Sequence, residues 1–193
     1  MLLALSTRLQ NQRAEQAFQL AQQEIDAIRV EAERGEDYAT FLASYPLTTA
    51  TNIADTEAPE TVAVTLDSTD ITVARAVDID DDSEDVDPED EEFAVQVFRT
   101  ASVNSSDGDL VAFRVGVRVY DNAALQRNTG SMLTEVASLT MTSSEGQRSQ
   151  RPLAVLYTDI IQSDQDLSLC GYRVYASPTG TDPATINSGL DCD

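Results

Sequence analysis

The stretch Leu110–Tyr120, LVAFRVGVRVY, is the part of the sequence that decides the fold. Its residues alternate between two types, as they do in a β-strand, where successive side chains point to opposite faces. One face carries Val111, Phe113, Val115, Val117 and Val119. The other face carries Ala112, Arg114, Gly116, Arg118 and Tyr120. This pattern predicts a strand with one buried and one solvated face, in an antiparallel sheet covered on one side.

Other segments share this period of two and are bounded by turn residues. The predicted strands are 61–66 (TVAVTL), 70–77 (DITVARAV), 93–99 (FAVQVFR), 135–142 (EVASLTMT) and 153–158 (LAVLYT). The residues Asp67–Thr69 are read as a turn between the first two. The sequence therefore predicts four to six strands.

The first part of the chain has helical periodicity instead. From about Ala4 to Arg34, small and apolar residues recur every three or four positions, and Gly35 is a helix stop. The stripe consists of Leu9, Ala14, Ala17, Phe18, Ala21, Ile25, Ile28 and Ala32. Such a narrow stripe predicts a helix that packs one side on a sheet.

The order of elements predicts an α+β fold, with a long N-terminal helix packed on an antiparallel sheet. We divide the chain into an amphipathic helix (1–35), an irregular connection (36–60) and a β-rich head (61–193) with an acidic loop at 78–92. Within the connection, Tyr38–Leu42 is expected to add a helical turn that ends before Pro46.

Composition limits the possible functions. The 193 residues contain no His, Lys or Trp and only two Cys, so histidine-based catalytic triads and four-ligand zinc or iron–sulfur sites are not available. The net charge of −22 argues against nucleic-acid binding, which requires a basic surface. We expect no enzymatic activity and assign no catalytic residues.

The acidic run Asp78–Glu92 has eleven acidic residues in fifteen. Such a density of like charge is typical of a solvated loop that joins two strands. The alternative is calcium binding, because Asp78, Asp80, Asp82, Glu84 and Glu89 match the ligand positions of an EF-hand count. Ser83 replaces the Gly of that motif and Pro88 interrupts it, so calcium is a weak candidate and no other cofactor is expected.

The only cysteines, Cys170 and Cys192, enclose a segment rich in turn residues near the end of the chain. This arrangement suggests a C-terminal loop closed by a disulfide, which would imply an oxidising compartment. The alternative is two free buried thiols.

The stretches LLALSTRLQNQRAEQAFQLAQQEIDAIR, FRVGVRVY and ASLTMTSSEGQRSQRPLAVLYTDI, with the two cysteines, resemble type IV pilins and type II secretion pseudopilins. They are most similar to cyanobacterial pseudopilins of hormogonium polysaccharide secretion. The prepilin peptidase site that marks the family is absent from the sequence. We therefore expect Leu2, Leu3 and Leu5 to be the end of an apolar segment that precedes the given chain.

The resemblance implies a structural subunit of a pilus-like or secretion filament, serving secretion or motility. Its partners would be other pilin or pseudopilin subunits and, through the preceding segment, the inner membrane, with the head in the periplasm or outside the cell. On the helix, the assembly face would comprise Leu9, Phe18, Ala21, Ile25 and Ile28.

Two other functions stay open. One is a secreted, calcium-stabilised binding or adhesin-like module, which the acidic run and a disulfide would serve equally well. The other is a carboxylate-based hydrolase, for which Asp109 and Asp159 flank predicted strands.

Overall fold

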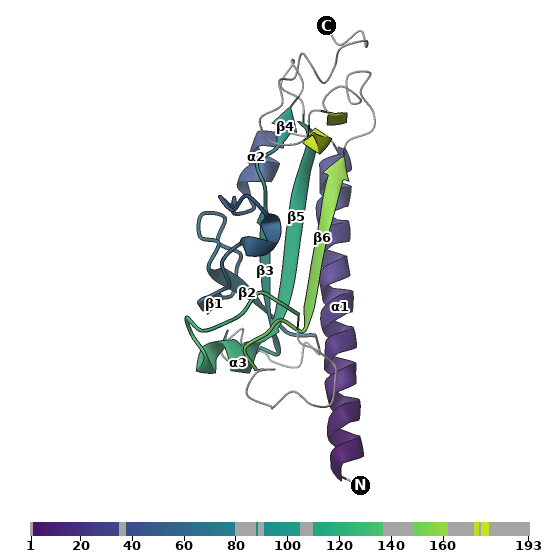
Figure 1. Ribbon diagram of the computed structural model, residues 1–193, viewed down its shortest axis with the longest axis vertical. Helices are drawn as coiled ribbons and strands as arrows, with labels where there is room; N and C mark the ends of the chain where they lie inside the picture. The colour runs from purple at the N-terminus through teal and green to yellow at the C-terminus, as the bar shows by residue number, and fades with distance from the viewer. Residues whose placement is uncertain are drawn as a thin grey trace, which may run out of the picture.

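The protein folds as one long helix packed on a six-stranded mixed sheet (Figure 1). The computed structural model describes residues 2–34, 38–79, 88, 91–104, 110–136, 149–161, 172–173 and 175–177, with the backbone alone for 2–7, 9 and 10. The helices are α1 (Leu2–Arg34), α2 (Tyr38–Ala43), the 3-10 turn η1 (Ile53–Asp55) and α3 (Asn122–Arg127). The strands are β1 (Thr61–Ala63), β2 (Val73–Val77), β3 (Phe93–Arg99), β4 (Val103–Asn104), β5 (Leu110–Asp121) and β6 (Ala154–Ile161).

Strand β5 is the centre of the sheet. It pairs antiparallel with β3 and β4 along one edge and with β6 along the other, while β2 and β1 extend the sheet beyond β3. The alternation in Leu110–Tyr120 thus correctly predicts the longest strand and, from Phe113 to Val119, its inner face. At the start of the strand, where the register with β4 shifts, Leu110 instead of Val111 joins the inner core. Most of the segment predicted as a strand at 135–142 lies outside the described residues, and residues 135 and 136 are not in a strand.

The expectation of a fully antiparallel sheet is wrong at one place, since β1 and β2 are parallel. The residues between them make two turns in succession instead of one. Asp67 accepts hydrogen bonds from the backbone and hydroxyl of Thr69, and Asp70 does the same for Thr72. Two reversals return the chain to the end where β1 began. A short connection suffices because β1 has only three residues.

The inner face of the sheet packs against α1, as the sequence predicts. The helix contributes Ala17, Leu20, Ala21, Ile25, Ile28 and Ala32 to a core shared with the valines and Phe113 of β5. Ion pairs from Arg13 to Asp121 and from Arg75 to Glu24 fix the same helix against the sheet. Figure 1 shows that the N-terminal part of α1 extends beyond the end of the sheet.

The outer face of the sheet is covered too, which contradicts the expectation of a solvated face. Ala112, Arg118 and Tyr120 are fully buried on this face. Of the five residues predicted to face solvent, only Arg114 is partly exposed. The cover is formed by residues 46–60, which we call the covering segment, and by α3 over Tyr120. The covering segment follows β3, with Thr48 N–H donating to Arg99 O at 2.8 Å and Arg99 N–H to Pro46 O at 3.0 Å.

Gly116 on β5 provides the space that this second layer needs. A Cβ at this position would lie 2.5 Å from Cε2 of Phe98 and 3.1 Å from Cδ1 of Tyr157. The ring of Phe98 is fully buried and cannot move without displacing its neighbours.

We expect Gly116→Ala to lower the free energy of unfolding by about 3 kcal/mol, the upper end of overpacking costs, because the added methyl meets the fully buried ring of Phe98. Urea denaturation of the purified chain measures this change. Gly130→Ala is the matched control: its φ is 71° and nothing lies within 4 Å, so only the left-handed backbone opposes the methyl, at about 1 kcal/mol. Equal destabilisation by the two substitutions would contradict the packing assigned to Gly116.

Candidate functional site

Arg118 of β5 lies at the centre of the outer layer and is fully buried. Its guanidinium donates to three backbone carbonyls of the covering segment. Nη2 donates to Ala54 O at 2.9 Å, while Nη1 donates to Thr56 O at 2.8 Å and to Glu57 O at 3.2 Å. The guanidinium therefore fixes the covering segment to the central strand.

Side chains of the neighbouring strands complete the surroundings of Arg118. Nε and Nη2 both donate to the hydroxyl of Tyr157 at 3.2 Å, and Nη1 donates to Oε1 of Gln96 at 3.3 Å. The guanidinium carbon lies 4.8 Å from the centre of the Phe98 ring, a cation–π distance. Gln96 in turn donates to the carbonyls of Glu57 and Ile71.

This cluster is built for structure. Within the described part of the chain, every acceptor that the guanidinium contacts is neutral, and all three of its nitrogens are engaged. A buried charge is tolerable when its donors are satisfied and aromatic faces surround it. Because its donors are already occupied, Arg118 is not poised to bind a ligand anion. The sequence pattern assigned it to the solvated face and gave no signal of burial.

A second cluster lies on the exposed part of the same face. Arg114 donates to Asp159 from Nε at 2.7 Å and from Nη2 at 3.3 Å, and the hydroxyl of Tyr175 donates to Asp159 at 2.7 Å. The hydrogen bond from Arg114 is the main reason why the pKa of Asp159 lies below its usual value. Burial and the hydrogen bond to this carboxylate raise the pKa of Tyr175.

Asp159 therefore stays ionised and is paired on both sides, which does not suit a general acid. Its suggested partner Asp109 lies outside the described residues. Among the described residues, Glu33 of α1 lines the same pocket of about 160 Å³ as Asp159, together with Arg29.

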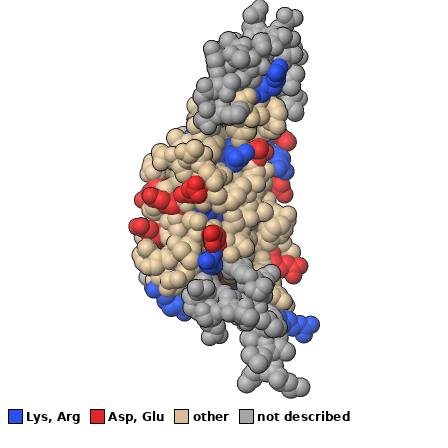
Figure 2. Space-filling model, in the orientation of Figure 1, with Lys and Arg blue, Asp and Glu red and all other residues tan. Residues whose placement is uncertain are grey.

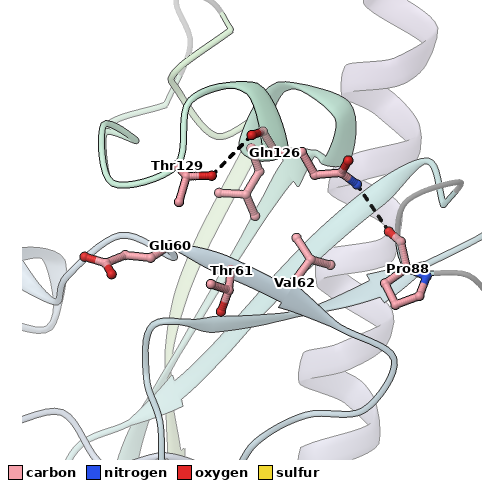
Figure 3. Close-up of a pocket in the computed structure, with 7 residues that line it drawn as sticks. Glu60, Thr61, Val62, Pro88, Gln126 and Thr129 are labelled. Atoms are coloured by element: carbon pink, nitrogen blue, oxygen red, sulfur yellow. Dashed lines mark hydrogen bonds between the residues drawn. The ribbon is translucent and has the colours of Figure 1, made fainter.

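The candidate binding site is a pocket of about 370 Å³ between β1 and α3 (Figure 3). Its lining consists of Glu60, Thr61, Val62, Pro88, Leu125, Gln126 and Thr129. Nε2 of Gln126 donates to Pro88 O at 3.4 Å and so connects α3 to the end of the acidic run. The hydroxyl of Thr129 donates to Gln126 O at 3.2 Å. The sequence did not point to this pocket, because its residues come from three distant segments.

The structure separates the residues expected to form the assembly face of the helix. Ala21, Ile25 and Ile28 are buried against the sheet of their own chain, whereas Phe18 is 44% exposed. The side chain of Leu9 lies outside the described part of the structure. A surface for other subunits on the described helix would therefore use other residues than the three buried ones.

The remaining sequence-based candidates are almost entirely outside the described residues. This holds for Cys170, Cys192, Asp80, Asp82, Glu84 and Glu89, while Asp78 follows β2 and is half-buried. The described residues contain no group of three or more potential metal ligands of the His, Cys, Asp or Glu type. Calcium binding by the acidic run and the disulfide both stay predictions.

Charge on the surface is mixed. Figure 2 shows acidic side chains spread over the visible face with arginines between them, and the described part of this face has no continuous basic patch. Within the described stretches, no helix is both long and apolar enough to cross a membrane. Comparison of the chain with protein-family models, curated proteins and solved structures found no match.

We expect Arg118→Met to lower the free energy of unfolding by at least about 3 kcal/mol, because it leaves several buried acceptors without a donor. Thermal and urea denaturation measure the change. The control is Arg114→Met, the same substitution four residues earlier on the same face of β5. Its partly exposed ion pair is worth about 1 kcal/mol or less. Equal effects of the two substitutions would contradict the role assigned to Arg118.

Proposed function

We propose that the protein is a structural, non-enzymatic subunit of a pilus-like or secretion filament. The observation that carries the proposal is the shape of α1, a 33-residue helix whose N-terminal part extends beyond the end of the sheet. At 1.5 Å per residue the helix is about 50 Å long. Among the helix side chains that the structure describes, the core begins at Ala17, and Arg13 still pairs with Asp121 at the end of β5. The N-terminal part of α1 extends beyond the end of the sheet (Figure 1).

The projecting turns have the composition of a helix that packs on other helices. The sequence places Leu2, Leu5 and Leu9 at helical spacing, on a stretch that contains no acidic residue before Glu15. An isolated helix gains little stability from propensity alone and depends on packing of its apolar side. In the proposed filament, the corresponding helices of neighbouring subunits supply that packing.

The head supports this proposal through its rigidity. The covering segment, α1 and α3 close both faces of the sheet over β5, and the two arginines of the outer face of β5, Arg114 and Arg118, are hydrogen-bonded within the chain. Such a head can present a surface of constant shape, and this role requires no catalytic residues. By the pilin resemblance, the subunit would be held in the inner membrane before assembly and would display its head in the periplasm or outside the cell.

We expect Leu9→Gln to reduce incorporation of the full-length protein into filaments at least tenfold in its source cell. Gln preserves helix propensity but removes the apolar contact between projecting helices. Filaments sheared from the cell surface are collected by sedimentation, and the subunit is quantified by immunoblotting against the whole-cell amount.

The control is Gln12→Ala, on an exposed position of the same projecting stretch, which should assemble like the unmodified chain. Gln12→Ala should melt within about 2 °C of the unmodified head, because Gln12 is exposed. The melting temperature of Leu9→Gln is measured beside it, so that a loss of incorporation is separated from a loss of folding. A subunit that never sediments with filaments, or an L9Q variant that assembles normally, would refute the proposal.

A further inference from the structure

The strand β6 forms an edge of the sheet that has the features of a docking site for a further strand. Among the described residues it pairs with β5 only, in continuous register from Ala154 to Ile161. The other strands with a single described neighbour, β1 and β4, have three and two residues, whereas β6 has eight. Short edge strands protect a sheet from pairing with another chain, and a long, regular one favours such pairing.

The ladder shows which backbone groups of β6 point away from the sheet. Both backbone groups of one residue point to the same side of a strand, and successive residues alternate. Arg114 O accepts from the N–H of Thr100 at 2.9 Å, so the backbone of Arg114 faces β3. Val115 therefore faces β6, where it pairs with Thr158. The N–H groups that point to the open side, where the described chain provides no further strand, are those of Val155, Tyr157, Asp159 and Ile161.

The strand lacks the features that commonly protect an edge. Its sequence, AVLYTDII, contains no proline, and its pairing with β5 shows no bulge. Its one charged residue is Asp159, whose carboxylate accepts hydrogen bonds from Arg114 and Tyr175. This charge is thus already compensated and does not oppose a strand that pairs with β6.

Apolar side chains lie on both sides of the edge. On the outer face, Tyr157 and Ile161 are exposed. On the other side, Arg29 and Glu33 of α1 line a pocket with the last residues of β6. Phe18 precedes Arg29 by about three helical turns, so this exposed ring lies on the same side of α1, toward the start of β6 (Figure 1). An added strand therefore finds apolar contacts for both of its faces.

The pocket beside the end of β6 suits one side chain of an added strand. Its volume of about 160 Å³ lies below the range of small-molecule pockets, about 300–1,000 Å³. Most of its lining is apolar, from Ala32, Leu110, Ile160 and Ile161. The pocket thus favours an apolar side chain near one end of the bound segment.

We propose that β6 accepts an extended, apolar and basic segment of another protein as a further strand of the sheet. Backbone hydrogen bonds to the open edge supply affinity, and side chains at alternate positions supply specificity. The charge of the chain selects the partner, because a net charge of −22 attracts basic segments and repels acidic ones, including a second copy of the chain. The edge belongs to the head, so this binding is separate from the turns of α1 invoked for assembly.

The test is an NMR titration of the full ¹⁵N-labelled chain with the capped peptide Arg-Val-Arg-Val-Thr-Val-Arg-Val, at an ionic strength of about 0.15 M. Hydrogen exchange of backbone amides is the readout. In the free chain, the amides of Tyr157 and Asp159 should exchange at least about tenfold faster than those of Leu156 and Thr158, and saturating peptide should remove this difference. Equal protection of all four amides in the free chain, or no binding at about 1 mM peptide, would overturn the proposal.

Two control peptides separate backbone pairing from charge. Replacing the central Val-Thr by Pro-Pro preserves the charge and removes two adjacent N–H groups, one of which must face β6. Replacing the three arginines by glutamates preserves the strand and reverses the charge. We expect both to bind at least about tenfold more weakly. Equal binding of the proline peptide would show attraction by charge alone, equal binding of the acidic peptide would show that charge does not select the partner, and either result refutes the proposal.

Val155→Pro locates the contact on the protein. Because the N–H of Val155 points to the open side, proline removes one donor of the edge and no bond to β5. Val155→Ala is the matched control, since it loses the same side chain and keeps the donor. With both variants folded by circular dichroism, the proline variant should bind the basic peptide about fivefold more weakly than the alanine variant. Equal affinities would refute the site, and amide protection that rises with protein concentration alone would name a second copy as the occupant instead.

Discussion

The buried guanidinium of Arg118 is the contact on which the two-layered head depends. It lies on the central strand of the sheet and donates hydrogen bonds to three backbone carbonyls of the covering segment. The other backbone contacts of this segment with the sheet are mainly along β3. Burying this charge is favourable only when its donors are satisfied. The sheet, the covering segment and the aromatic rings of Phe98 and Tyr157 therefore have to come together as a unit.

The two faces of β5 are stabilised by different physics. On the inner face, valines and Phe113 bury apolar area against α1, an interaction that is strong but not directional. On the outer face, hydrogen bonds from Arg118 and Gln96 to backbone carbonyls fix the position of one irregular segment. Both kinds of contact leave the N-terminal turns of α1 beyond the sheet, and in the filament that we propose these turns would pack on another subunit.

Sequence periodicity predicts the helices and strands whose formation depends on the local spacing of apolar residues. The helix stripe, β3, β5 and the inner face of the sheet follow from it, because apolar spacing and burial coincide there. The alternation predicts that Arg118 and Tyr120 face solvent, but both are buried. The burial of Arg118 depends on residues 46–60, which are distant in sequence, and that of Tyr120 depends on α3 and Leu133, which follow the strand. The parallel pairing of β1 and β2 depends on two side-chain turns, and the two-residue β4 is too short to show any period.

The exchange rate of arginine side-chain protons with solvent tests the burial of Arg118 most directly. In an NMR exchange experiment on the full chain, we expect the Nε–H of Arg118 to exchange at least about 100-fold more slowly than that of Arg8, which is exposed on α1. This protection should disappear only when the protein unfolds. Exchange of Arg118 at the rate of Arg8 in the folded protein would show that the outer face of the sheet is open to water, and would contradict the account.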